Sequence, residues 1–178
     1  MLITSHAQAI ELLDDVREPV TTREAAIRYL AKEPTSAVIA RLVQALQDDD
    51  FSVRWEAANA VAQQGEAGML AMLHALTDAA RVGDPRLRDC AYHILHLNAG
   101  LIPVPITELL EALHRGPAAD IASLVEADRV LRQWKKYRSA QALTMNKPGV
   151  RGAVQLNLLN PREGLAQLTG RLSRLAKR

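Results

Sequence analysis

The sequence predicts an all-α protein, and three observations lead to this prediction. Apolar residues make up 48% of the 178 residues, whereas aromatic residues make up only 3%. This composition favours closely packed helices over sheets, which are enriched in β-branched and aromatic residues. No stretch alternates convincingly between apolar and polar residues, and helix start and stop signals recur along the chain. We therefore expect a helical body.

The first three helices have recognisable start and stop signals. Ser5 and Thr21 each stand three residues before a glutamine or glutamate, which is the form of a capping box. Pro19 and Pro34 separate these helices, because proline disfavours helical geometry in the residue before it.

Aspartate and glycine delimit the middle helices. Asp50 can cap one helix, and Gly65 can take the left-handed conformation that ends it. Asp84 followed by Pro85 is a cap with proline at the first helical position, and Gly100 lies past the end of that helix. Together the signals predict helices near residues 5–17, 21–33, 35–47, 51–64, 67–80, 85–98, 105–115 and 117–140.

A two-helix unit recurs along the chain. Arg23, Arg54 and Arg88, offset by 31 and 34 residues, each flank the apolar stripe of a helix, and the helices between them share an apolar face in register. A unit of this size cannot bury its face alone, so its copies must stack. The sequence therefore predicts a short α-α superhelix, or solenoid.

We expect the three recurring arginines to set the register of this stack. At the turns they can reach carbonyl groups and aspartates such as Asp50 and Asp84. An exposed ion pair contributes only about 0–1 kcal/mol. Leucine burial, at about 1.5–3 kcal/mol per side chain, must therefore provide most of the stability. The alternative is that the arginines form a basic ligand-binding ladder.

Two stretches resemble a known repeat family. They are LVQALQDDDFSVRWEAANAVAQQG and, more weakly, MLHALTDAARVGDPRLRDCAYHIL. Their D-x-x-V-R-x-x-A-A core resembles the HEAT-like repeats, in particular the short kind described in phycobilisome lyases, over roughly residues 21–115. The resemblance implies that the arginine-bearing helices lie on the convex side of the superhelix and that the following helices line the concave side. It also implies a noncatalytic protein-binding scaffold. A lyase-type enzyme is a remote alternative that rests on family association alone.

The concave face is the expected binding surface, because stacking leaves one helix of each repeat facing inward. Its side chains form a mixed polar set, suited to contact with an unidentified protein or peptide. The alternative is a plain solvated face. The residues expected on this face are Arg41, Gln44, His74, Glu108 and Glu111.

The sequence offers no convergent catalytic, metal-binding or cofactor-binding set. Cys90, His93 and His96 have metal-ligand chemistry, but successive side chains three residues apart on a helix turn by about 60°. Only one adjacent pair could then share an ion, and tetrahedral zinc needs further ligands. The acids near Asp14 and Asp48 lie at helix ends, where we expect them to be solvated. We therefore expect no enzymatic activity and no cofactor.

Charge is distributed unevenly along the chain. Residues 1–128 hold 10 Lys/Arg and 19 Asp/Glu, whereas residues 129–178 hold 12 Lys/Arg and the single acid Glu163. Such a basic tail can bind an anionic surface, which can belong to nucleic acid, to a partner or to this protein's own acidic half.

The segment RVLRQWKKYR supports a second hypothesis, nucleic-acid binding, because it interleaves aromatic and cationic side chains. The alternative is a helix C-terminus whose cations complement the helix dipole. The residues expected to contact nucleic acid are Arg132, Trp134, Lys135, Lys136, Tyr137 and Arg138.

We expect a repeat domain over residues 1–142 and a basic segment over residues 143–178. This segment would begin irregularly and end in an amphipathic helix over residues 161–177. The leucine stripe of that helix needs a partner surface, either on the same repeats, on a second copy in a homodimer, or on nucleic acid or membrane. A single cysteine fits a reducing compartment. The chain start indicates neither a signal peptide nor a membrane span, so we expect a cytoplasmic protein.

Overall fold

The computed structural model describes residues 2–78, 81 and 83–145. The chain divides into two compact units, residues 1–134 and residues 135–178, and each is described by itself. All regular elements within the described residues are helical, which confirms the predicted all-α fold class. In chain order they are α1 (His6–Asp14), α2 (Val20–Leu30), α3 (Ser36–Ala45), α4 (Phe51–Gln63), α5 (Gly65–Leu76), α6 (Pro85–Leu97), η2 (Ala99–Leu101), α7 (Thr107–His114), η3 (Gly116–Ala119) and α8 (Asp120–Met145).

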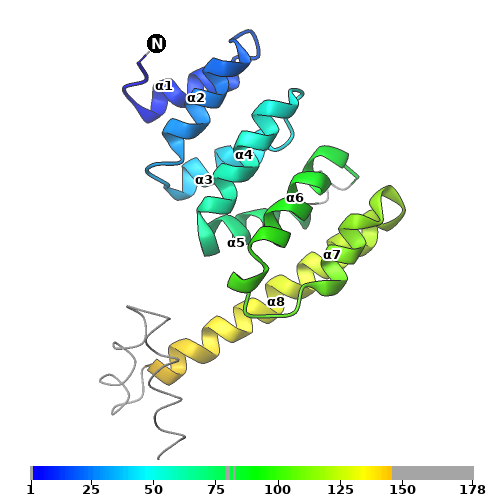
Figure 1. The fold of residues 1–178 in the computed structure, drawn as a ribbon. Coiled ribbons are helices and arrows are strands. Elements are labelled where there is room, and N and C mark those ends of the chain that lie inside the picture. The colour runs from blue at the N-terminus through cyan, green and yellow to red at the C-terminus, as the bar shows by residue number, and fades with distance from the viewer. Residues whose placement is uncertain (1, 79–80, 82, 146–178) are drawn as a thin grey trace, which may run out of the picture. The chain divides into compact units, whose positions relative to one another are not determined.

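The helices of the first unit stack as repeated pairs (Figure 1). Helix α4 packs between α2 and α6, and these three helices form what we call the arginine layer, since they carry Arg23, Arg54 and Arg88. Helices α3, α5 and α7 form the second layer. Within this layer α3 packs on α5, whereas α7 packs on α6 of the arginine layer. This arrangement is the stacked two-helix repeat that the sequence predicts.

A continuous core lies between the layers. Ala26, Ala57 and Ala91 occupy equivalent positions on the three helices of the arginine layer and are fully buried, so their small side chains let neighbouring backbones approach closely. Large apolar side chains of the second layer fill the facing positions and are equally buried. At the equivalent position of each second-layer helix they are Leu42, Met72 and Leu109.

The helix starts agree with the sequence at three positions. The Ser5 hydroxyl accepts a hydrogen bond of 3.2 Å from the amide of Gln8. Asp50 and Asp84 cap α4 and α6 by accepting hydrogen bonds from the first free amides of each helix. Pro85 occupies the first turn of α6, as predicted. Local side-chain chemistry therefore determines these three helix starts.

The start of α2 differs from the prediction. The helix begins at Val20 with Pro19 in the N-cap position and without a side-chain cap, so the capping box predicted at Thr21 is wrong. The reason is that the Pro19 carbonyl already accepts hydrogen bonds from the amides of Thr22 and Arg23. Thr21 consequently lies inside the first turn, where no cap is needed.

Helices α4 and α5 meet at a tight connection. Gly65 has a φ of 56°, the left-handed conformation predicted for it, and α5 begins at this glycine rather than near residue 67. A Cβ atom added at Gly68 would lie only 2.0 Å from the carbonyl oxygen of Val61. Glycine at this position therefore lets α5 pack directly on the backbone of α4.

Helix α8 extends further than predicted. It runs to Met145, across the domain boundary expected after residue 142, whereas the first compact unit ends at Trp134. The predicted irregular stretch after residue 145 and the amphipathic helix over residues 161–177 lie outside the described residues.

Candidate interaction surfaces on the repeat stack

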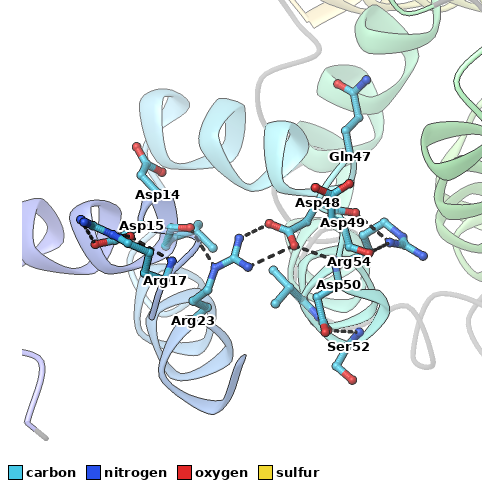
Figure 2. Close-up of polar contacts among 12 residues, drawn as sticks. Asp14, Asp15, Arg17, Arg23, Gln47, Asp48, Asp49, Asp50, Ser52 and Arg54 are labelled. Atoms are coloured by element: carbon cyan, nitrogen blue, oxygen red, sulfur yellow. Dashed lines mark hydrogen bonds and ion pairs between the residues drawn. The ribbon is translucent and has the colours of Figure 1, made fainter. Parts of the chain in front are cut away.

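Arg23 joins the ends of α1 and α3. Its Nε atom donates a 3.3 Å hydrogen bond to the carbonyl oxygen of Leu13, and its Nη1 atom donates a 3.2 Å hydrogen bond to Asp48 (Figure 2). The Nη2 atom contacts the second carboxylate oxygen of Asp48. The Asp48 side chain is only 11% exposed, so the expectation that it is solvated is wrong. Asp48 follows the end of α3, and its pairing with the buried Arg23 accounts for its low exposure.

Arg54 binds backbone rather than a carboxylate. Its Nη1 atom donates to the carbonyl oxygens of Asp48 at 2.7 Å and Asp49 at 2.9 Å, just after α3 ends (Figure 2). The sequence predicts that this arginine reaches carbonyl groups or aspartates such as Asp50. In the structure it binds the carbonyl groups. A cation at this position complements the negative end of the α3 dipole.

Arg88 lies at the junction of α6 and α8. It donates a 2.9 Å hydrogen bond to Asp120 at the start of α8, instead of reaching Asp84. Asp84 accepts a 2.7 Å hydrogen bond from the side chain of Gln47, which links α3 to α6. Burial acts to raise the pKa of Asp84, but the hydrogen bonds from Gln47 and from the first amides of α6 outweigh it and lower the pKa. Each of the three arginines therefore lies at a junction between helices.

A groove of about 420 Å³ opens beside the Arg23 cluster. Side chains from the ends of α1 and α3 line it, together with the Asp84 cap of α6. Within it Arg41 pairs with Asp14, and burial lowers the pKa of Arg41. Gln44 and Gln47 add amide donors and acceptors. The volume falls within the usual range for ligand-binding pockets, about 300–1,000 Å³.

The five residues expected on the concave face all lie on the second layer, and we call them the second-layer strip. Gln44 is exposed on α3, His74 on α5, and Glu108 and Glu111 on α7, whereas Arg41 is partly buried. Glu108 accepts a 3.2 Å hydrogen bond from Arg129. Glu111 accepts a 3.3 Å hydrogen bond from Arg115 at the end of α7. Gln44 and His74 have no side-chain hydrogen bond or ion pair within the described part of the chain.

Sequence reasoning missed two of the partners in this strip. The pairs Arg41–Asp14 and Glu108–Arg129 join different helices, and only the packing brings them together. The Glu111–Arg115 pair is spaced four residues apart on a helix, and this spacing was a usable signal.

Cys90, His93 and His96 have separate surroundings. The Cys90 sulfur lies 3.8 Å from the carbonyl oxygen of Leu46, and burial raises the pKa of this thiol to about 11. The His93 ring centroid lies 4.2 Å from that of Trp55, and His96 stacks on a tyrosine of its own helix. No group of three His, Cys, Asp or Glu residues that could hold a metal ion occurs in the described ranges.

An aromatic cluster on the arginine layer has no counterpart in the sequence predictions. Phe51 and Trp55 stack one turn apart on α4, and both are exposed. The Arg54 guanidinium lies 5.7 Å from the Phe51 ring centroid.

His93, which contacts Trp55, is partly buried. Burial and, to a lesser degree, the nearby charge of His96 lower the pKa of His93. Its Nε2 atom is buried and has no hydrogen-bond partner within the described residues.

The six side chains expected to contact nucleic acid lie in two different environments, one buried and the other exposed. Trp134 is only 2% exposed and belongs to the core, so the expectation that it stacks on a base is wrong. It lies on the same face of α8 as Ala127 and Val130, which are also buried. The remaining residues are exposed, and Arg132 pairs with an aspartate one turn earlier. They are Arg132, Lys135, Lys136, Tyr137 and Arg138.

Comparison with known proteins supports the architecture. No curated protein and no solved structure matches the chain. A family model described as HEAT repeats matches residues 7–96, about half of the chain, from α1 into α6. HEAT repeats are commonly protein-interaction scaffolds and typically non-enzymatic. The match does not distinguish the phycobilisome-lyase kind, which stays a prediction. None of the described helices has the length and apolarity needed to span a membrane. The matched repeats and the stacked helix pairs show that this chain belongs to the HEAT repeat family.

Proposed function

We propose that this protein is a noncatalytic interaction module that binds a segment of another protein along the second layer. The second-layer strip would make the contact, and the groove at its α3 end would anchor the segment. The observation that carries this proposal is the groove itself, because two residues of the second-layer strip, Arg41 and Gln44, form part of its lining. An anchoring pocket beside a flatter polar surface is the usual arrangement of energetic hot spots in protein interfaces.

The chemistry of the groove favours an extended peptide segment with a basic side chain. Its lining includes three aspartates and two arginines. Arg23 and Arg41 pair with Asp48 and Asp14, so the lining keeps one net negative charge, which comes from Asp84. Amide groups such as that of Gln44 can bond to both the N–H and the C=O of a peptide backbone. Charge complementarity of this kind directs partner choice more than it raises affinity.

Photo-crosslinking tests the proposal. A photoreactive amino acid is placed at Gln44 or at His74, and as a matched control at Ser52, which is exposed on α4 of the arginine layer. Crosslinks from positions 44 and 74 to the same region of one protein, and none from position 52, would support the proposal. Equal crosslinking from all three positions, or crosslinking from position 52 alone, would contradict it.

Nucleic-acid binding is a second candidate, supported by the exposed cations of α8. Without Trp134, the contact would rest on phosphate pairing and on Tyr137. We expect any such binding to weaken steeply with salt and to be lost when Lys135 and Lys136 become alanine. Fluorescence anisotropy with labelled single and double strands measures this, and the exposed pair Lys32 and Glu33, changed to alanine, is the control.

A further inference from the structure

The carboxylate of Asp84, which gives the groove its net charge, has few free hydrogen-bonding positions. A carboxylate offers about four lone-pair positions, two on each oxygen. The Oδ1 atom of Asp84 accepts hydrogen bonds from the backbone amides of Arg86 at 2.8 Å and Leu87 at 3.4 Å. The Oδ2 atom accepts one of 2.7 Å from the side chain of Gln47. The position that stays available is therefore on Oδ2.

The side chain of Gln47 adds a second acceptor beside this position. The hydrogen bonds that lower the pKa of Asp84 keep its carboxylate ionised at neutral pH. An ionised carboxylate only accepts hydrogen bonds, so Gln47 must present its NH2 group to Asp84. The amide carbonyl of Gln47 then has no hydrogen bond within the described residues, and both side chains line the groove. The groove therefore offers one charged oxygen and one neutral oxygen on neighbouring side chains.

These two acceptors fit an ammonium group better than a guanidinium group. We infer that the groove selects a lysine of the partner segment over an arginine, and that Asp84 determines this choice. The lysine ammonium is a compact charge with several donors, so it can bond to Oδ2 of Asp84 and to the carbonyl oxygen of Gln47. An arginine guanidinium binds best as a fork with one bond to each carboxylate oxygen, and Oδ1 has no position left for it. This inference rests on the proposed function, because the lysine belongs to the segment that binds the second layer.

The remaining charges of the groove make the contact weak. Arg23 offsets the charge of Asp48, and Arg41 offsets that of Asp14. The positive end of the α6 dipole offsets part of the charge of Asp84 as well. We therefore expect a single lysine to bind with a dissociation constant of about 1–20 mM. The rest of the partner segment would supply most of the affinity.

Solution NMR of the full chain tests the inference with capped amino acids as probes. The probes are N-acetyl-lysine methylamide, N-acetyl-arginine methylamide and, as a neutral control with the same carbon stem as lysine, N-acetyl-norleucine methylamide. Each probe is titrated to about 100 mM at constant ionic strength, and the side-chain amide signals of Gln44 and Gln47 are followed. We expect the lysine probe to shift both signals saturably and the arginine probe to bind at least about threefold more weakly. The norleucine probe should cause no saturable shift.

A pair of matched variants tests the role of Asp84. Asp84→Asn removes the charge and keeps the cap of α6, because asparagine caps helices as well as aspartate does. It should weaken binding of the lysine probe at least about fivefold. Asp50→Asn is the control, because Asp50 caps α4 with hydrogen bonds of 2.8 Å and 3.3 Å but does not line the groove. It should leave the dissociation constant unchanged, and circular dichroism establishes that both variants are folded.

Three results would overturn the inference. They are failure of the lysine probe to bind, equal binding of the lysine and arginine probes, and equal effects of Asp84→Asn and Asp50→Asn. Photo-crosslinking keeps these results separate from the proposed function. A partner crosslinked from positions 44 and 74, without binding of the lysine probe, leaves the proposed function in place and removes lysine selection. Binding of the lysine probe without any crosslinked partner leaves a lysine-binding groove and removes the proposed function.

Discussion

Arg23 and Asp48 form a nearly buried ion pair that also holds the ends of α1 and α3 together. Removing one partner leaves an uncompensated buried charge, which costs about 3–5 kcal/mol. Replacing both partners by apolar residues of similar volume is often close to neutral. The pair therefore matters less for its net energy than for the geometry that it imposes on the two helix ends.

We expect Arg23→Met to lower the free energy of unfolding by about 3–5 kcal/mol, because Asp48 loses its counter-charge. The double variant with Asp48→Leu should recover most of this loss, though not the hydrogen bond that Asp48 accepts from the Asp50 amide. Urea denaturation measures each value. Arg17→Met, which breaks an exposed pair with Asp15, is the control and should have little effect. Equal losses in the single and double variants would refute this reading.

His93 should make stability depend on pH. Burial, with the charge of His96, lowers the pKa of His93 from 6.5, so the folded chain takes up its proton at lower pH than the unfolded chain. Stability is then fully present above about pH 6.5 and is lost as the pH falls towards the folded pKa.

Urea midpoints between about pH 8 and about pH 5 measure this dependence. His93→Gln should flatten the decline below pH 6.5, whereas His74→Gln, at an exposed position on α5, should leave it unchanged. An identical decline in the unmodified chain and the His93→Gln variant would show that other groups cause it.

The contact between α4 and α5 depends on the absence of a side chain at Gly68. A Cβ atom there would lie 2.0 Å from the Val61 carbonyl oxygen, and backbone cannot yield as a flexible side chain can. We expect Gly68→Ala to cost at least about 1–3 kcal/mol by forcing the two helices apart. Gly100→Ala is the control, because a Cβ atom at Gly100 meets nothing within 4 Å. Thermal unfolding compares the two, and similar melting temperatures would contradict the prediction.

Periodicity predicted the helices well but not their contacts. Stripes of apolar residues and local caps such as Asp50 and Asp84 depend on neighbours in sequence, so they can be read directly. The buried environment of Trp134, the close approach at Gly68 and the Arg88–Asp120 pair depend on how helices dock. The many cations around Trp134 favour a solvated position for it. Its burial is instead decided by the face of α8 on which it lies, and this face packs on the core.

The sequence indicates which helices carry the candidate surface, and its role as a binding site is a prediction. The five residues of the second-layer strip were expected on one set of helices, and they all lie on that set. The groove was not predicted, because it arises where the ends of α1 and α3 and the start of α6 come together. Whether this surface binds a partner stays a prediction.

Within the first compact unit, α4 has the most central place, since it packs on α2, α3, α5 and α6. A repeat stack is stabilised by contacts between neighbours, so its ends open more readily than its middle. We therefore expect the amide hydrogens of α4 to exchange most slowly in native-state hydrogen exchange, and those of α1 to exchange faster. Equal protection of α1 and α4 would indicate that the stack opens as one cooperative unit.

The thiol of Cys90 has a practical consequence for spectroscopy. With a pKa of about 11, only about one thiol in ten thousand is ionised at neutral pH, and the sulfur is shielded from reagents. A maleimide dye or a spin label would therefore modify an engineered surface cysteine selectively, with the native cysteine left in place. Distances between two such labels could then be followed in solution without first building a cysteine-free background.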